Sequence, residues 1–337
     1  MKIFSVNDWE PLKEIIVGRA DFAYIPPPDP SMKNFMYARL TYREISKFVG
    51  SYSDRIIDES NSDLEDLCDK LKELGVKVHR PKRIRHDASI VTPYWKTTGW
   101  HNYCPRDIFL VVGTSIVEVP SVMRSRIFET WSYDHIMHEA FEDGAKWFSA
   151  PRQKYKDESF NFDDLSKPTL MNEEILFDAP NVVRMGMNLL YQISNSGNEK
   201  GARWLQSMFP EYKLHIERDA YSGAHFDSTV VPLTEGLVLF NGHRVSKDNY
   251  PKIFEKWDKI FFHNFPMIKS DVSGISSDAI GMNLLSINED LVIVDENQTE
   301  LIKTLLRYGI ESIPMPMRHA RTLGGGFHCV TLDLKRG

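Results

Sequence analysis

The sequence predicts an α/β protein in which five copies of one small unit pack around a common axis. A pattern of strand, tight turn, strand, helix and closing strand recurs along the 337 residues. No copy is large enough to bury both faces of its own strands, so neighbouring copies must cover one another. The hydrophobic content of 42% is typical of a soluble globular protein with a large core. We therefore expect one domain that spans residues 1–337.

The clearest copy of the unit lies near the C-terminus. Residues 283–287 and 291–294 are apolar runs of strand length, and the polar residues 288–290 between them predict a turn. Leucine and isoleucine recur at helical spacing over residues 298–307, and residues 310–314 are predicted to be the closing strand.

The other four copies follow the same order along the chain. Two segments, residues 22–60 and 150–176, interrupt the pattern, and we expect them to be surface insertions that could cover the mouth of a central site. The predicted elements are a strand at 14–18 with a helix over 64–74 and a strand at 76–78; strands at 107–112 and 116–120; strands at 182–185, 189–193 and 212–217 with a helix over 200–208; and strands at 229–231, 237–240 and 260–263 with a helix over 251–257.

Composition excludes several classes of protein. A net charge of −6 offers no electrostatic reason to bind nucleic acid. The three cysteines, Cys68, Cys104 and Cys329, are too few for a disulfide framework and lack the Cys-x-x-Cys spacing of a zinc site. No apolar run has the length needed to span a membrane, and the N-terminus lacks the apolar stretch of a signal peptide. We expect a cytoplasmic protein without membrane or nucleic-acid partners.

Five polar residues lie at the starts or edges of predicted apolar strands: Asp107, Asp178, His225, Asp227 and Cys329. Equivalent positions of a radial fold converge on its axis, so these side chains are expected to share one pocket. Any one of the aspartates, taken alone, is more simply a turn former at a strand edge. A thiol with several carboxylates suits a cationic substrate, because carboxylates bind a planar guanidinium through paired hydrogen bonds.

Cys329 follows three consecutive glycines, Gly324 to Gly326, and precedes an alternating run at 330–334 that predicts a strand. Glycine allows the backbone to come close to a ligand, and a cysteine mounted there could act as a nucleophile. The simpler interpretation is a buried cysteine behind a glycine loop. Arg244 and Ser277 are candidates to hold a carboxylate at the far end of the substrate, although each alone would be an ordinary surface residue.

Several motifs in one order resemble the amidinotransferase family, which includes glycine amidinotransferase and bacterial enzymes that transfer an amidino group from arginine. The resemblance covers nearly the whole chain and implies the five-bladed α/β propeller of ββαβ modules known as the pentein fold. The motifs are Asn7-Asp8-Trp9-Glu10-Pro11-Leu12, Pro105-Arg106-Asp107, Arg124-Ser125-Arg126, Gly144-Ala145-Lys146-Trp147, Phe177-Asp178-Ala179, His225-Phe226-Asp227 and Gly324-Gly325-Gly326-Phe327-His328-Cys329.

The resemblance also implies a role for each candidate residue. Cys329 corresponds to the nucleophile, His225 to the general acid/base and Asp178 to its orienting partner. Two further carboxylates, Asp107 and Asp227, correspond to the guanidinium clamps. Arg244 and Ser277 fall where the family binds the carboxylate of the donor. Ala224 replaces a methionine of the vertebrate glycine enzyme in a loop that shapes the acceptor side, so the acceptor need not be glycine.

The implied reaction is a ping-pong transfer from L-arginine through an amidino-cysteine to an acceptor amine, with release of L-ornithine and without a metal or organic cofactor. The resemblance makes a homodimer a reasonable assembly. The main alternative is an arginine deiminase or related guanidine hydrolase, which would use water in place of the amine. A propeller that only binds a partner is a weaker alternative, because such a protein needs no cysteine, histidine and three aspartates in register.

Overall fold

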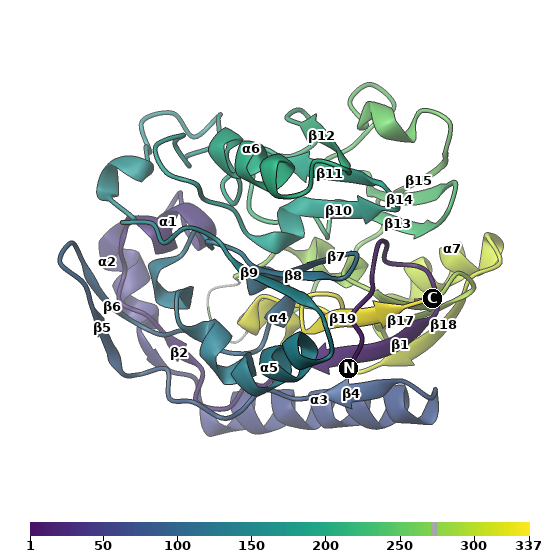
Figure 1. Cartoon of the computed structure of the whole chain (residues 1–337), viewed down its shortest axis with the longest axis horizontal. Coiled ribbons are helices and arrows are strands. Elements are labelled where there is room, and N and C mark those ends of the chain that lie inside the picture. Colours follow the sequence, from purple (N-terminus) through teal and green to yellow (C-terminus); the bar gives the residue numbers. More distant parts are fainter. Residues whose placement is uncertain (271, 273–274) are drawn as a thin grey trace.

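The computed structural model describes residues 1–270, 272 and 275–337, and its core is a set of five three-stranded sheets (Figure 1). In each sheet the first two strands are antiparallel, and the second and third are parallel. The strands, sheet by sheet, are β19 (Thr331–Arg336), β1 (Leu12–Val17) and β4 (Lys77–His79); β7 (Phe109–Val112), β8 (Ser115–Glu118) and β9 (Lys146–Ser149); β10 (Val182–Met185), β11 (Asn188–Gln192) and β12 (Lys213–Glu217); β13 (Val230–Thr234), β14 (Leu237–Asn241) and β15 (Asp258–Phe262); and β16 (Leu285–Asn288), β17 (Leu291–Asp295) and β18 (Glu311–Met315).

A helix connects the second and third strands of four of these sheets. These helices are α3 (Asp54–Glu73), α5 (Asp134–Glu142), α6 (Glu199–Met208) and α7 (Thr299–Arg307). The helix predicted over residues 251–257 is wrong, because the structure has only the 3₁₀ turn η6 (Lys252–Phe254) there. Phe254 is fully buried and packs edge-on against Phe240. Because a helix of only a few residues is marginally stable by itself, this packing contact decides the backbone conformation of the segment.

The five sheets form a closed ring, which confirms the α/β fold of five repeated units. Each hydrophobic cluster of the core joins side chains from two consecutive sheets, and the last cluster returns to the first sheet. Pairs that share a cluster, in ring order, are Leu332 and Phe109, Leu110 and Leu189, Leu190 and Val238, Leu239 and Val292, and Ile293 and Ile15. The strands are therefore covered on both faces, which is why they are apolar runs without strict alternation.

The two ends of the chain complete the first sheet together. β19 near the C-terminus pairs antiparallel with β1 near the N-terminus, with Ile16 opposite Leu332. The alternating run at 330–334 is thus a strand, as predicted, but its partner was not foreseen. Pairing of the termini closes the ring and places Cys329, two residues before β19, beside the other sheets.

Short helical turns lead into the first strands of four sheets, and the candidate residues lie on or beside these turns. Asp107 is in α4 (Pro105–Ile108), Asp178 caps η5 (Ala179–Asn181), and Asn283 follows η7 (Asp278–Met282). α8 (Ala320–Leu323) precedes the loop that carries Cys329. The repeated position explains why residues far apart in sequence gather at one end of the ring.

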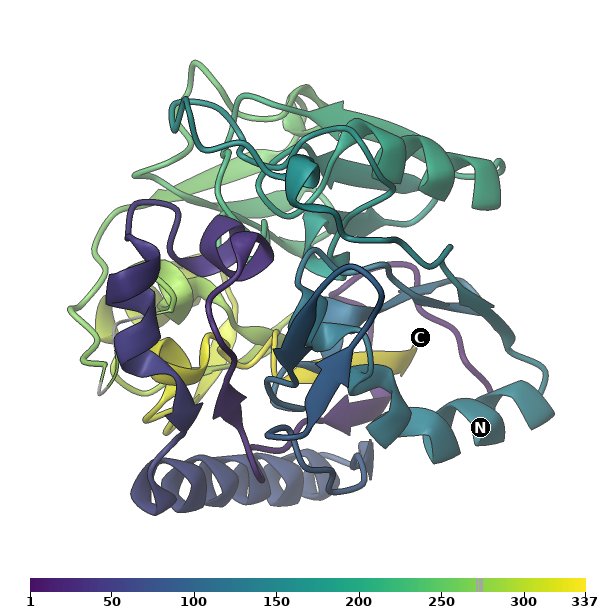
Figure 2. The ribbon, with the colours of Figure 1, turned by 90° about the vertical axis from the view of Figure 1, so that its left-hand side faces the viewer.

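The remaining elements lie outside the five units. Figures 1 and 2 place α1, α2 and the β5–β6 hairpin together on one side of the molecule. The predicted insertion 22–60 contains α1, α2, η1 and the β2–β3 pair, and it ends inside α3, whereas 150–176 contains η4. The bounds are β2 (Tyr24–Ile25), α1 (Pro30–Met36), α2 (Tyr42–Ile45), η1 (Ser46–Phe48), β3 (Gly50–Ser51), β5 (Ser89–Val91), β6 (Lys96–Thr98), η2 (Arg124–Arg126), η3 (Glu129–Tyr133) and η4 (Asp157–Ser159).

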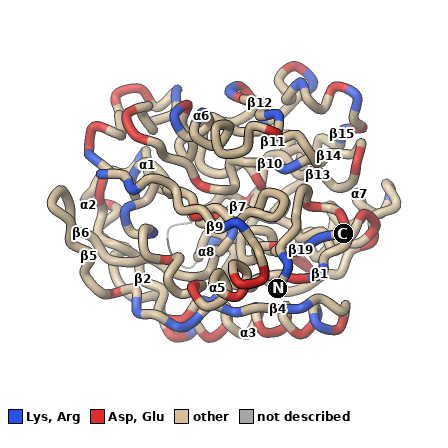
Figure 3. The backbone as a smooth tube through the Cα atoms, viewed as in Figure 1, with Lys and Arg blue, Asp and Glu red and all other residues tan. Residues whose placement is uncertain are grey.

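Acidic and basic positions are interspersed along the elements, α3 included (Figure 3). Among the described residues, no helix combines the length and the apolar character that crossing a membrane requires.

Candidate active site

One pocket of about 460 Å³ collects five of the seven predicted site residues: His225, Asp227, Arg244, Ser277 and Cys329. The other two, Asp107 and Asp178, lie directly behind His225 and contact its ring. The structure therefore brings all seven together. Residues 34–40 of the first insertion also line this pocket, and covering of its mouth by an insertion stays a prediction.

Cys329 lies in the wall of the pocket and is only 2% exposed. Its backbone N–H donates to Asn283 Oδ1 at 2.8 Å, and its Sγ lies 3.2 Å from Asp227 Oδ2. Burial raises the pKa of the Cys329 thiol well above its ordinary value, and the negative charges of Asp227 and Asp107 raise it further. The group is therefore a thiol that donates its proton toward Asp227.

His225 is held in an unusual backbone conformation. Its φ of 59° lies in the left-handed region, which non-glycine residues adopt rarely. Its backbone N–H donates to Ser196 Oγ at 2.8 Å, and its ring Nε2 donates to Asp178 Oδ2 at 3.1 Å. The second ring nitrogen, Nδ1, lies 3.7 Å from Asp107 Oδ1. Phe35 packs edge-on against the imidazole, with ring centroids 4.9 Å apart.

The surroundings of His225 favour its charged form. Burial alone would lower the pKa of the imidazole, but the charge of Asp107 and the hydrogen bond to Asp178 outweigh burial and raise it. Asp178 is fully buried, and its other oxygen, Oδ1, accepts from the backbone N–H of Val122 at 3.1 Å. Asp178 Oδ2 thus orients the imidazole, while Oδ1 holds the carboxylate itself in place.

Asp107 and Asp227 share a feature that distinguishes them from Asp178. Asp107 Oδ2 accepts from Arg126 at 2.7 Å, whereas Asp107 Oδ1 is buried without a hydrogen bond from any residue that the structure describes. Asp227 Oδ2 accepts from His328 and Asn283, each at 2.8 Å, as well as from Cys329. Within the described chain, each carboxylate is therefore anchored through Oδ2, and its Oδ1 accepts no hydrogen bond; Asp107 Oδ1 faces His225 Nδ1, whereas Asp227 lines the pocket.

Arg244 and Ser277 are paired in the same pocket. Arg244 Nη2 donates to Ser277 Oγ at 3.0 Å, and its Nη1 donates to Thr229 Oγ1 at 2.7 Å. The guanidinium also stacks over the ring of Tyr221 at 3.9 Å. A guanidinium held in this way is pre-organised to bind a carboxylate.

The three glycines before Cys329 act mainly through packing. Gly324 has a φ of 83° and ends α8 in the left-handed conformation. A Cβ on Gly325 would come within 2.5 Å of Cys104 Sγ, and one on Gly326 within 2.8 Å of Asn283 Cβ. Gly325 and Gly326 thus allow the loop to approach two neighbouring side chains closely, and the approach of the loop to a ligand stays a prediction.

Four residues of the site had no role in the sequence analysis: Phe35, Arg126, Asn283 and His328. Arg126 and His328 lie in motifs that carry the family resemblance, and this was the available signal for them. Asn283 begins the clearest repeat and is equivalent to the predicted strand-start aspartates. Nothing in the sequence around Phe35 indicates that its ring packs on His225.

Comparisons with known proteins identify the family. No family model matches the chain. An inosamine-phosphate amidinotransferase from Streptomyces glaucescens is 42% identical over 344 residues, which cover 100% of this chain and 97% of the relative. This chain belongs to the amidinotransferase family. It is also 34% identical to an L-arginine:L-lysine amidinotransferase from Pseudomonas savastanoi pv. phaseolicola, with 99% of this chain and 94% of that protein covered.

Solved structures agree with the family and with the fold. The inosamine-phosphate amidinotransferase of Streptomyces griseus superposes with a TM-score of 0.96 at 42% identity and covers 99% of this chain and 97% of that one. A dimethylarginine dimethylaminohydrolase from Pseudomonas aeruginosa has a TM-score of 0.58 at 15% identity over 96% of this chain and 99% of that one. The second similarity shows only that this amidinotransferase shares the pentein fold with hydrolases.

No group of three or more His, Cys, Asp or Glu side chains is placed to hold a metal ion in the part of the chain that the structure describes.

Proposed function

We propose that this amidinotransferase moves the amidino group of L-arginine through a covalent amidino-Cys329 to a primary amine and releases L-ornithine. The observation that carries the proposal is a pair of anchored carboxylates: Asp227, beside the Cys329 thiol, and Asp107, behind His225, whose Oδ1 is a buried acceptor without a hydrogen bond from a described residue. A planar guanidinium offers N–H groups that match two such oxygens. In the same pocket Arg244 and Ser277 supply donors for the α-carboxylate of the amino acid.

The electrostatics of the site fit a cationic donor. Burial and the charges of two carboxylates keep Cys329 protonated. A bound guanidinium would offset the negative charge of these carboxylates. Binding of L-arginine therefore lowers the pKa of the thiol at the moment when the nucleophile is needed. The thiolate needs a protonated partner, and the raised pKa of His225 favours the imidazolium.

In the first half-reaction the Cys329 thiol passes its proton to His225, the thiolate Sγ bonds to the guanidino carbon, and the bond from that carbon to Nε of arginine breaks. His225 gives its proton to the departing ornithine amine, and Asp178 keeps the imidazole oriented during the transfer. In the second half-reaction the acceptor amine attacks the amidino carbon, its proton passes to His225, and the carbon–sulfur bond breaks. General acid/base assistance of this kind contributes roughly 10²–10⁴-fold.

For the acceptor we propose an amine that also carries an anionic group. Relatives that are 40–42% identical are named as inosamine-phosphate amidinotransferases, so a phosphorylated amino-cyclitol is the first candidate. Arg39 lines the outer part of the pocket, is exposed, and forms no hydrogen bond or ion pair with any described residue. Its guanidinium is available for a phosphate.

Two mass-spectrometric measurements test the proposal. Incubation with L-arginine alone should release one equivalent of ornithine and add one amidino group to Cys329, and a Cys329→Ser variant should show neither. Addition of inosamine phosphate, lysine or glycine in separate reactions should then give ornithine turnover with the correct acceptor. Formation of citrulline would refute the transfer from arginine and support the hydrolase alternative.

A further inference from the structure

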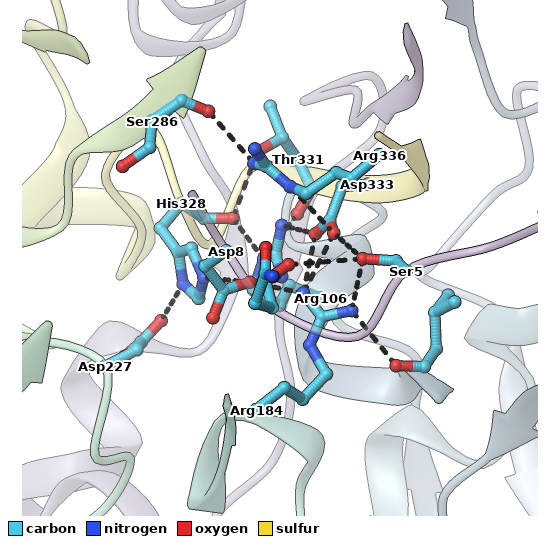
Figure 4. Close-up of polar contacts among 12 residues, drawn as sticks. Ser5, Asp8, Arg106, Arg184, Asp227, Ser286, His328, Thr331, Asp333 and Arg336 are labelled. Carbon is cyan, nitrogen blue, oxygen red and sulfur yellow. Dashed lines mark hydrogen bonds and ion pairs between the residues drawn. The ribbon is translucent and has the colours of Figure 1, made fainter. Parts of the chain in front are cut away.

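His328 lies between the candidate active site and a buried network of charges, and neither the fold nor the family name assigns it a role. Its Nδ1 lies 2.8 Å from Asp227 Oδ2, and its Nε2 faces Asp8 Oδ1 at 3.8 Å (Figure 4). Asp227 can only accept at this contact, because its low pKa keeps it ionised, so Nδ1–H is the donor. The ring thus connects the carboxylate beside the thiol to a carboxylate behind it.

Several ion pairs hold the charged residues on the other side of His328. Asp8 forms ion pairs with Arg184 and, at 3.5 Å, with Arg106. Both arginines also bind Asp333, which is fully buried, at 2.9 Å and 2.5 Å respectively. Arg106 Nε donates to the backbone carbonyl of His328 at 2.9 Å, so the main chain of His328 is fixed to the same network (Figure 4).

On the side that faces the pocket, His328 stabilises the ionised form of Asp227. Burial would raise the pKa of Asp227, but the hydrogen bond and the charge of His328 are foremost among the interactions that lower it to about 2. His328, Asn283 and Cys329 all bond Oδ2, so the carboxylate is held in one rotation with Oδ1 left over. Arg126 has the corresponding position at Asp107, where it occupies Oδ2 at 2.7 Å.

We propose that His328 is a positioning residue that orients Asp227 and keeps its charge directed at the cation of the donor, with Asp8 and the arginine network as its support. The inference rests on the proposed roles of Asp227 and Cys329. It assigns to His328 the same task at Asp227 that Arg126 performs at Asp107. The two guanidinium clamps are then each oriented by an N–H donor on Oδ2, Arg126 at Asp107 and His328 at Asp227.

Three variants separate this role from a general contribution to folding. His328→Ala removes the ring, His328→Asn retains an N–H donor at the place of Nδ1, and His328→Gln places its donor toward Asp8 at the place of Nε2. His138→Ala is the matched control, because this histidine is 61% exposed on α5. Circular dichroism and thermal unfolding establish the folded fraction of each protein.

The first readout is ornithine release from L-arginine. His328→Ala should lower kcat/KM by roughly 10- to 100-fold, mainly through KM, as expected for the loss of a hydrogen bond to a charged group. His328→Asn should recover most of this loss, whereas His328→Gln should not. If His328→Ala fails to fold, the comparison of the Asn and Gln variants carries the test.

The second readout does not depend on L-arginine as the donor. The rate at which 2-chloroacetamidine, a cationic amidinium, alkylates Cys329 is divided by the rate for the neutral 2-chloroacetamide, so that changes in thiolate fraction cancel. The ratio should be high in the wild-type protein and the Asn variant and at least about 10-fold lower in His328→Ala. A wild-type protein that keeps this selectivity but releases no ornithine would refute the proposed donor and leave the inference standing. An unchanged ratio in His328→Ala, or equal recovery by Gln and Asn, would overturn the inference.

Discussion

Replacing Asp178 by asparagine should change the pH dependence of the first half-reaction in a specific way. The substitution keeps the size of the side chain but removes the negative charge that lies 3.1 Å from His225 Nε2. Because Asp178 raises the pKa of His225, its loss lowers that pKa and disfavours the imidazolium. The reactive form has a thiolate at Cys329 and an imidazolium at His225, and it carries as many protons as the form with a thiol and a neutral imidazole. The substitution therefore shifts the balance between these two forms away from the reactive one.

The size of the effect follows from the contact that is lost. A hydrogen bond to a charged group contributes about 1.5–3 kcal/mol, and about 1.4 kcal/mol corresponds to a tenfold change in an equilibrium. The plateau of kcat/KM for L-arginine should therefore fall by roughly 10- to 150-fold, and its acid limb should move down by about 1 to 2 pH units. Well below that limb both proteins carry the imidazolium, so their rates should converge.

Rapid-quench measurement of ornithine release between pH 5 and 9 tests this reasoning. Asp163→Asn, an exposed aspartate in the second insertion, is the control and should match the wild-type protein at every pH. A loss that is the same at every pH would show that Asp178 acts only through geometry. A movement of the acid limb to higher pH would refute the thiolate–imidazolium arrangement.

Three further predictions concern the clamp, the acceptor and the nucleophile. Arg126→Gln removes the arginine that pairs with two buried carboxylates, Asp107 and Glu129, and we expect a loss of about 3–5 kcal/mol in the free energy of unfolding, measured with urea. Arg39→Ala should raise KM for a phosphorylated acceptor about tenfold and weaken competitive inhibition by inorganic phosphate, with Arg43→Ala, outside the pocket, as the control. The thiol pKa of Cys329, followed by ultraviolet absorbance of the thiolate, should fall when a non-reactive arginine analogue binds, because the cation of the analogue offsets the carboxylates that raise this pKa.

Each of these predictions has a result that would contradict it. Unchanged stability in Arg126→Gln would mean that the Asp107 carboxylate is protonated or has another partner. Equal effects of the two arginine variants would place the anionic group of the acceptor elsewhere. A thiol pKa that rises on binding of the analogue would show that desolvation by the ligand outweighs its charge.

Sequence periodicity was sufficient to predict the five repeated units, because apolar runs and helical spacing are local properties of the chain. It was also sufficient to place Asp107, Asp178 and Asp227 at the entrances of first strands, where repetition of the unit makes their positions equivalent. The family motifs identified Cys329 and His225, which the structure places in one pocket. The helix predicted over residues 251–257 was wrong, because burial of Phe254 determines the backbone conformation there and the helical spacing of apolar residues does not.

Tertiary structure alone decided how the site is assembled. β19 joins β1 only because the ends of the chain meet, and no local pattern in either segment names the other as its partner. The contact between Cys329 and Asp227 joins positions 102 residues apart. Which oxygen of Asp107 or Asp227 is occupied, and by Arg126 or His328, depends on how the sheets pack around the axis. The residue types needed for the chemistry are therefore visible in the sequence, whereas the partners that orient them come from contacts made only when the ring closes.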